Sequence, residues 1–362
     1  MGISGGKDSA ALAVYLRNKY PDLDIEYYFA DTGKELPETY EFIDNLEIYL
    51  GRKIELLKAI EEDLVDPFDY YVKWIYDGYL PSPKARWCTV TLKLEPFEKF
   101  VGDIQTVSYV AIRGDENREG YISHKSNIQT IFPFRKNIWS KDVINKVLNN
   151  DNISKLVDLY KLLADKEKQG TMLKIVRRPL SWDFDRRQKL AILLDFGIPL
   201  FNKVVFEFLK TTDYPLGKLD HFPLLDNEDS IERDDVFRLL ENSGVSKPKY
   251  YKELPLEVNG KKGTYFRSRS GCFFCFFQQK IEWIWLYEQH RDLFEKAQKY
   301  EKDGYTWNEG EPLNDLIKPE RMKQVKENYL TKVTRKCKTP SDKLLNILLD
   351  ENEGEGCIAC FV

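Results

Sequence analysis

The stretch Ser4-Gly5-Gly6-Lys7-Asp8-Ser9 decides the fold of this chain, and an amphipathic helix pattern follows it at once in residues 10–16. Two glycines let the backbone turn tightly and bring consecutive N–H groups close to a phosphate. The helix directs the positive end of its dipole to the same place, and Lys7 adds a point charge. Asp8 is a candidate to hold a magnesium ion or to cap the helix. We therefore predict a phosphate-binding loop, with a glycine turn beside an ordinary surface lysine as the alternative.

The hexapeptide differs from the usual nucleoside-triphosphate loop. That pattern places a glycine five residues before the Gly-Lys pair, where this chain has Met1, and Ser or Thr directly after the lysine, where it has Asp8. A loop of this kind normally follows a buried strand, yet only residues 1–3 precede it. Either the first strand is clipped or the numbered chain begins inside a longer one.

The loop resembles instead the PP-loop of the N-type ATP pyrophosphatases, which include adenylating synthetases, tRNA thiolation enzymes and phosphoadenosine phosphosulfate (PAPS) reductases. This resemblance implies an α/β, parallel-sheet (adenine nucleotide alpha-hydrolase-like) domain that binds ATP and Mg²⁺. It also implies nucleotide-binding and catalytic roles for loop residues. The nucleotide ligands would be Ser4, Gly5, Gly6, Lys7, Asp8 and Ser9, of which Lys7 and Asp8 would be catalytic.

Composition sets the class of protein. The chain has 362 residues, 42% of them hydrophobic, and a net charge of −4. It is long enough for two or three domains with real cores, which excludes a disordered chain. No apolar run is long enough for a membrane span and no signal peptide precedes the loop, so we expect a soluble cytoplasmic protein. The mild acidity argues against coating nucleic acid through overall charge, although a local basic groove that includes Arg267 and Arg269 stays open.

Parallel strands are predicted at residues 25–30, 54–57 and 106–112, which are rich in β-branched and aromatic residues. Ligands of open α/β sheets bind at the carboxyl ends of the strands. Asp31, Thr32 and Gly33 follow the first of these strands and should line the nucleotide pocket.

Two arginines follow the strand at 106–112. Arg113 and Arg118 are natural phosphate or sulfate ligands, because guanidinium groups pair with oxyanions in bidentate geometry. We expect Arg113 to be catalytic as well. The alternative is that Arg113 only pairs with Asp115 or Glu116.

Three segments are predicted. Residues 1–136 would form the PP-loop domain, 137–220 a charged helical insertion with leucine patterns at 155–168 and 186–210, and 221–362 a mostly helical module that carries cysteines. The insertion is most simply a helical spacer, and nothing in it suggests catalysis.

Six cysteines include two Cys-x-x-Cys pairs, a spacing that favours metal, cluster or redox chemistry over disulfides in a cytosolic chain. Cys272 and Cys275 can reach one metal, and the other ligands would come from Cys88, Cys357 and Cys360. A [4Fe-4S] cluster and a structural Zn²⁺ site with four thiolates both fit this set. We favour the iron–sulfur cluster.

Residues 267–280 resemble the carboxyl-terminal part of PAPS-reductase-like proteins associated with DNA phosphorothioation. The resemblance implies an enzyme that adenylylates an acceptor for sulfur transfer, with a nucleic acid as acceptor and a sulfur donor such as a cysteine desulfurase as partner. One alternative is a PAPS or APS (adenosine phosphosulfate) reductase, whose nucleophile would be a tail thiol at Cys357 or Cys360. Another is a non-catalytic nucleotide-binding partner with a zinc-held module.

Overall fold

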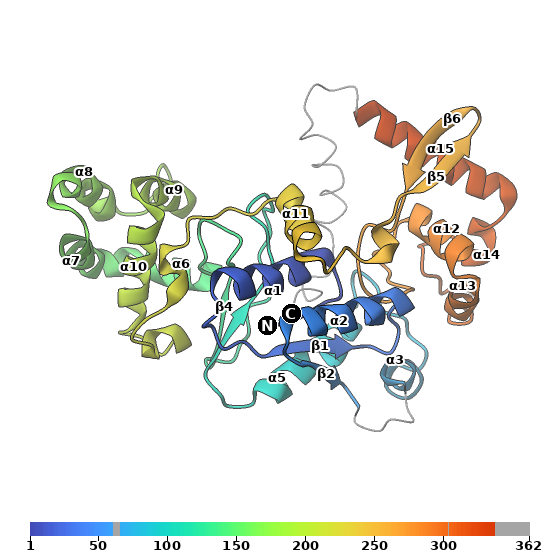
Figure 1. The fold of residues 1–362 in the computed structure, drawn as a ribbon, viewed down its shortest axis with the longest axis horizontal. Helices are drawn as coiled ribbons and strands as arrows, with labels where there is room; N and C mark the ends of the chain where they lie inside the picture. The colour runs from blue at the N-terminus through green and yellow to red at the C-terminus, as the bar shows by residue number, and fades with distance from the viewer. Residues whose placement is uncertain (61–65, 303, 337–362) are drawn as a thin grey trace.

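The computed structural model describes residues 1–60, 66–302 and 304–336 (Figure 1). Three parts follow one another along the chain. Parallel strand pairs lie in the middle of the molecule, a group of helices lies on one side, and a module of helices and one hairpin lies on the other. None of the helices in these ranges is long and apolar enough to cross a membrane.

The amino-terminal part alternates strands and helices, as an α/β domain requires. The first helix begins at Lys7 directly after the loop, and Pro37 begins the second, where its missing N–H costs little. The elements in chain order are α1 (Lys7–Lys19), β1 (Tyr27–Asp31), α2 (Pro37–Leu50), β2 (Ile54–Lys58), α3 (Pro67–Tyr70), η1 (Tyr71–Ile75), α4 (Trp87–Thr89), η2 (Val90–Leu94), α5 (Glu95–Val101), β3 (Thr106–Tyr109) and β4 (Ile128–Ile131).

The strands pair in parallel, as predicted. Strand β1 pairs with β2, with Tyr27 opposite Ile54, and β3 pairs with β4. Residues 1–3 run alongside β1 in the same direction: the Ile3 N–H donates to the carbonyl oxygen of Tyr28 at 2.7 Å. The loop at 4–9 and the last residue of β1, Asp31, therefore lie at the same carboxyl edge.

Strand β4 was not predicted, because polar residues interrupt its apolar run. Gln129 and Thr130 are nonetheless buried, with 1% and 5% of their surfaces exposed. The Gln129 Oε1 accepts a hydrogen bond from the N–H of Leu216 at 3.0 Å, and the Thr130 hydroxyl donates to the carbonyl oxygen of Tyr121. Distant segments thus satisfy side chains that the sequence pattern assigns to the surface.

The middle of the chain is helical, as predicted. The pattern at 186–210 forms two helices rather than one, because Gly197, at φ +148°, separates them and Pro199 lies in the first turn of the second. The elements are α6 (Lys141–Val147), η3 (Asn150–Asn152), α7 (Ile153–Leu163), α8 (Lys166–Arg177), α9 (Arg186–Phe196), α10 (Ile198–Leu209), η4 (Pro215–Lys218) and η5 (Pro223–Asp226).

The carboxyl-terminal part consists mainly of helices. Its first helix ends at Gly244, which has a left-handed conformation, and the turn at Asn259 and Gly260 connects the two strands of an antiparallel hairpin. The residues at both places predict these features. The elements are α11 (Arg233–Ser243), η6 (Lys249–Tyr251), β5 (Leu254–Val258), β6 (Lys261–Tyr265), α12 (Lys280–Gln289), α13 (Arg291–Gln298), α14 (Leu313–Leu316) and α15 (Pro319–Lys336).

Two large apolar cores hold these parts together. One joins α1, β1 and α2 to the helices α6–α11. The other joins the module to Leu36, Phe68 and Trp87 of the amino-terminal part. The second core therefore fixes the cysteine module beside the carboxyl edge of the strands. The segment boundaries at 136 and 220 stay a prediction.

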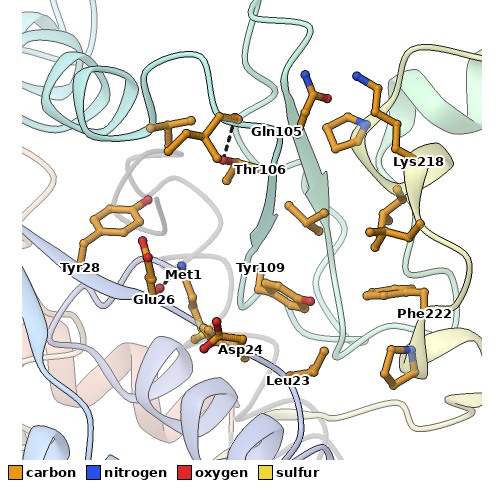
Figure 2. Close-up of a pocket in the computed structure, with 18 of the residues that line it drawn as sticks. Met1, Leu23, Asp24, Glu26, Tyr28, Gln105, Thr106, Tyr109, Lys218 and Phe222 are labelled. Carbon is orange, nitrogen blue, oxygen red and sulfur yellow. Dashed lines mark hydrogen bonds between the residues drawn. The ribbon is translucent and has the colours of Figure 1, made fainter.

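A cavity of about 720 Å³ lies between the two strand pairs (Figure 2). Tyr28 and Glu26 line it from the β1 side, Thr106 and Tyr109 from the β3 side, and Phe222 from the segment before α11. Thr106 is the first residue of β3, so the cavity opens at the amino ends of the strands. It is separate from the loop at 4–9, where a nucleotide is expected.

Candidate functional site

The loop at 4–9 is held in shape by its own hydroxyl groups. The Ser4 N–H donates to Ser9 Oγ at 3.1 Å, and the two serine hydroxyls lie 3.1 Å apart. The Ser9 hydroxyl also donates to the carbonyl oxygen of Gly6 at 3.3 Å. Gly6 is the N-cap of α1 and has no side chain that could cap the helix. A helix start with a glycine at this position leaves room for an anion beside its first N–H groups.

Both glycines of the loop are required by geometry. Gly5 has φ +71°, and a Cβ there would lie 2.4 Å from Cγ2 of Thr39 in α2. A Cβ on Gly6 would lie 2.7 Å from the Ser270 Oγ of the cysteine module. Larger residues would strain the turn or push these neighbours away.

Lys7, Asp8 and Arg113 form a buried ion network directly after the loop. Lys7 Nζ lies 2.9 Å from Asp8 Oδ2, and Arg113 Nη1 lies 3.0 Å from Asp8 Oδ1. Arg113 is fully buried, and Lys7 is 2% exposed. Asp8 thus does not cap the helix, because both its oxygens bind cations. The structure brings together the three residues for which we expected a catalytic role.

The charge of Asp8 is fixed by its partners. Burial by itself raises the pKa of this carboxyl group, but the cations of Lys7 and Arg113 outweigh burial and hold the pKa well below its ordinary value. Asp8 is therefore ionised at every physiological pH. Its charge keeps two cationic side chains beside the start of α1.

Arg113 and Arg118 also pair with nearby carboxylates. Arg113 Nε lies 3.0 Å from Asp115 Oδ1, so the pairing that we considered as an alternative is present together with the contact to Asp8. Arg118 Nη2 lies 2.8 Å from Glu116 Oε1. A role for either arginine in binding an anion stays a prediction.

The segment after β1 forms a polar turn at the same edge. The Asp31 Oδ1 accepts hydrogen bonds from the N–H of Gly33 and the hydroxyl of Tyr40, both at 2.8 Å. The Thr32 hydroxyl donates to Glu35 Oε1 at 3.1 Å. Asp31 and Thr32 thus lie at the carboxyl end of β1, as predicted, with their side chains engaged in holding the turn.

The cysteine module covers the loop. The Tyr250 hydroxyl donates to the carbonyl oxygen of Gly5 at 2.6 Å, and the ring of Tyr251 lies 5.8 Å from Lys7 Nζ. The Phe273 N–H donates to the carbonyl oxygen of Lys34 at 2.8 Å. Residues of the amino-terminal part and of the cysteine module therefore form the site together.

Cys272 lies at this junction. Its Sγ is 3.1 Å from Thr32 Oγ1 and 3.9 Å from Glu35 Oε1. Burial and the negative charge of Glu35 raise the pKa of the Cys272 thiol well above its ordinary value. Arg267 shapes the turn, because its Nη2 donates to the carbonyl oxygen of Cys272 at 2.8 Å.

The described residues do not complete a metal site. Cys88 and Cys272 pack against the core of the module, and none of Cys88, Cys272 and Cys275 forms a disulfide. Within the described ranges, no group of three or more His, Cys, Asp or Glu side chains is placed to hold a metal ion. Cys357 and Cys360 lie outside the described residues. The four-thiolate ligand set therefore stays a prediction.

Sequence reasoning missed the residues that join the module to the loop. Tyr250, which contacts Gly5, and Glu35, which lies beside Cys272, are such residues. Each is ordinary in its local sequence and gains its position only through contacts with distant segments. The one usable signal was the recurrence of aromatic residues around the cysteine pair.

The comparisons with known proteins each cover part of the chain. The model of the phosphoadenosine phosphosulfate reductase domain family matches residues 1–161. Two uncharacterized proteins of Methanocaldococcus jannaschii, MJ0066 and MJ0973, are 28% identical over 199 residues and 27% identical over 160 residues. These alignments cover 51% and 41% of this chain.

A third relative comes from a virus. The uncharacterized nin region protein ORF290 of Escherichia phage lambda is 27% identical over 139 residues, or 32% of this chain. The aligned part spans 36% to 48% of the length of these three curated relatives. No solved structure matches the chain. The buried loop and the parallel strands agree with the match of residues 1–161 to the phosphoadenosine phosphosulfate reductase domain family.

Proposed function

We propose that this protein binds ATP at the loop 4–9, releases pyrophosphate and adenylylates an acceptor for sulfur transfer. One observation carries the proposal: the start of α1 is buried, has a glycine as its N-cap, and has Lys7 in its first turn. A helix start of this kind, with a cation next to it, favours a phosphate group.

The chain's own residues would act mainly by electrostatics. Negative charge builds on the leaving phosphates during attack on the α-phosphate, and Lys7 with the first N–H groups of α1 would stabilise it. Asp8 would hold Lys7 in place. Arg113 would be a positioning residue in this scheme, since its guanidinium binds Asp8.

We propose that Mg²⁺ binds together with the nucleotide. Both oxygens of Asp8 already bind cationic side chains, so the carboxylate does not fit as a metal ligand in this arrangement. Mg²⁺ is commonly held through the phosphates of a nucleotide, where it neutralises their charge. We therefore assign no magnesium ligand among the described side chains.

The acceptor and the sulfur donor are proposed from the resemblance of residues 267–280. We propose a nucleic acid as acceptor, with DNA phosphorothioation in a defence system as the biological setting and a cysteine desulfurase as donor. An iron–sulfur cluster on the cysteines, with zinc as the alternative, belongs to the same proposal. The metal content and the visible spectrum of anaerobically purified protein would separate iron from zinc.

A thiol-dependent PAPS or APS reductase is the second candidate, because Cys272 places a thiol 3.1 Å from Thr32 at the site and could act as its second thiol. In that reaction a thiolate attacks the sulfonyl sulfur, an S–S bond forms, and the bond from sulfur to the phosphate oxygen breaks. The nucleotide leaves, and a second thiol then attacks the cysteine sulfur, which forms a disulfide and releases sulfite. The raised pKa of Cys272 works against it as the attacking group, which leaves the tail thiols as the nucleophile of this candidate.

An assay of the purified protein separates the two candidates. We expect ATP to give pyrophosphate in the presence of acceptor and no sulfite to appear from PAPS. Lys7→Ala should abolish pyrophosphate release, whereas Lys53→Ala should not, because Lys53 is exposed and pairs with Glu55 away from the loop. Sulfite release from PAPS, lost when both tail cysteines are replaced, with no pyrophosphate from ATP, would support the reductase instead.

A further inference from the structure

The start of helix α11 is held beside the loop by two sets of contacts. The hydroxyl of Tyr15 in α1 lies 2.8 Å from Asp229 Oδ2. The N–H of Gly114 donates to the carbonyl oxygen of Ile231 at 2.9 Å, and Gly114 directly follows Arg113. Helix α11 also packs along α1 (Figure 1). Its first turn is therefore fixed between α1 and the Arg113 segment.

One face of α11 is directed toward Lys7. Arg233, the first residue of the helix, places its guanidinium carbon 5.9 Å from the ring of Phe237, one turn later. The Phe237 ring packs edge-on against Tyr251, with 6.4 Å between centroids. Tyr251 in turn lies 5.8 Å from Lys7 Nζ. Arg233 thus begins a row of side chains that leads through Phe237 and Tyr251 to Lys7.

Arg233 is buried, and no carboxylate in the described part of the chain pairs with it. It is 6% exposed, and its buried Nη1 has no hydrogen-bond partner among the residues that the structure describes. Among the neighbouring carboxylates, Glu232 and Asp235 form the capping box of α11, and Asp234 is exposed. A buried guanidinium with an unsatisfied N–H costs free energy, and such a group in a native fold calls for a partner.

We propose that Arg233 binds a phosphate oxygen of the anion that the loop 4–9 holds. A guanidinium forms two parallel hydrogen bonds to a phosphate, which a lysine cannot do. Cations from two helices, Lys7 of α1 and Arg233 of α11, favour a ligand with more than one phosphate group. This inference deepens the proposed function and rests on its placing an anion at the loop.

The assignment also gives the carboxyl-terminal part of the chain a role in the site. Arg233 lies outside residues 1–161, so the matched domain would not by itself contain all the cations that bind the ligand. The helix that supplies Arg233 is continuous with the segment that leads to Tyr250 and the cysteine turn. Anion binding would then stabilise the contact between the two parts.

Titration of the full-length protein with inorganic pyrophosphate tests the proposal. By isothermal titration calorimetry, Arg233→Ala should raise the Kd about tenfold to a hundredfold, because a charge-assisted hydrogen bond is lost. Arg233→Lys should give an intermediate Kd, since lysine keeps the positive charge but cannot form the two parallel hydrogen bonds of a guanidinium. The matched control is Arg238→Ala on the same helix, which is exposed and should leave the Kd unchanged. Inorganic phosphate should be less affected than pyrophosphate.

The outcomes separate this inference from the proposed function. If Lys7→Ala loses pyrophosphate binding while Arg233→Ala and Arg233→Lys bind like the wild type, the inference is wrong and the proposed function stands. If Lys7→Ala binds pyrophosphate like the wild type, the loop site itself is wrong. Should Arg233→Ala not fold, Arg233→Lys decides alone: a Kd raised several-fold supports the inference, and an unchanged Kd overturns it.

Discussion

Two buried arginines flank the loop, and they differ in how their charges are satisfied. Arg113 binds Asp8 and Asp115 at 3.0 Å each, so carboxylates surround its guanidinium. Arg233 has a buried N–H with no partner in the described part of the chain. Arg113 therefore stabilises the fold through its ion pairs, whereas we propose that Arg233 gains its partner when an anion binds.

This difference separates a residue that stabilises the fold from one that we propose binds the ligand. A fully paired ion network stabilises the fold. Removing one member leaves its partner as a buried charge without compensation, in surroundings that solvate it poorly. A buried charge that lacks a partner contributes little to stability and gains its interaction only when an anion binds. Stability and binding should therefore respond in opposite ways to substitutions at these arginines.

The largest effect is expected for Arg113→Ala. It should lower the free energy of unfolding by about 3–5 kcal/mol, because Asp8 stays buried with one cation fewer. Arg233→Ala should change it by less than about 1 kcal/mol, since no native ion pair is lost. Urea denaturation of both variants measures the contrast. Equal losses of stability would show that ion pairing does not distinguish the two arginines.

Gly5→Ala should come next. The left-handed φ of +71° and the approach to Thr39 at 2.4 Å both penalise a side chain, so we expect a loss of about 2–3 kcal/mol. Gly310→Ala is the matched control, because Gly310 has the same φ and nothing within 4 Å of its Cβ position. Thermal and urea unfolding should show a larger loss at Gly5. A loss at Gly310 as large as that at Gly5 would mean that the close packing of the loop contributes nothing.

Tyr250→Phe tests the contact between the module and the loop. The variant removes the hydrogen bond to the carbonyl oxygen of Gly5 and leaves a buried acceptor unsatisfied, so stability should fall by about 1–2 kcal/mol. Tyr49→Phe, which loses an exposed hydrogen bond to Asn18, should change stability by less than about 0.5 kcal/mol. Hydrogen exchange should also speed up at residues 4–9 in Tyr250→Phe alone. Unchanged exchange there would argue against a module that braces the loop.

The smallest effect concerns the contact of Glu38 with His290, whose Oε1 and Nε2 atoms lie 2.8 Å apart between α2 and the module. Burial favours the neutral carboxyl group, but the hydrogen bonds from His290 and the backbone, together with nearby positive charge, outweigh burial and lower the pKa of Glu38 below the ordinary 4.5. A lowered carboxyl pKa adds stability above the unfolded pKa, and the gain is lost as the pH falls through the folded pKa.

Glu38→Gln should therefore lower the free energy of unfolding by about 1 kcal/mol near neutral pH. The difference from wild type should shrink below about pH 4, where the carboxylate becomes protonated. Urea titrations across this range measure it. A difference that stays constant with pH would show that the charge of Glu38 is not involved.

Much of the amino-terminal fold was predictable from local sequence. Helix α1 follows its glycine loop, Pro37 begins α2, and β1, β2 and β3 come from continuous apolar runs, because each of these signals acts over a few residues. Strand β4 was missed since Gln129 and Thr130 are made compatible with burial only by distant partners. Local pattern cannot contain that information.

The candidate site was predictable in part for the same reason. Lys7 and Asp8 lie within the motif, and Arg113 follows a strand that ends at the same edge. Arg233 stands in the charged run Glu-Arg-Asp-Asp, which is typical of an exposed helix start, and only the fold shows that it is buried. Tyr250 gave no signal, because its contact with Gly5 spans 245 residues.

Titration of the purified protein with ATP, followed by calorimetry, decides whether the loop 4–9 is a nucleotide site. We expect wild type and the control Lys53→Ala to bind ATP with equal affinity. Lys7→Ala, measured under conditions where it is folded, should bind at least about a hundredfold more weakly. Binding by Lys7→Ala at the wild-type Kd, or no binding by the wild type with or without Mg²⁺, would contradict the proposed function.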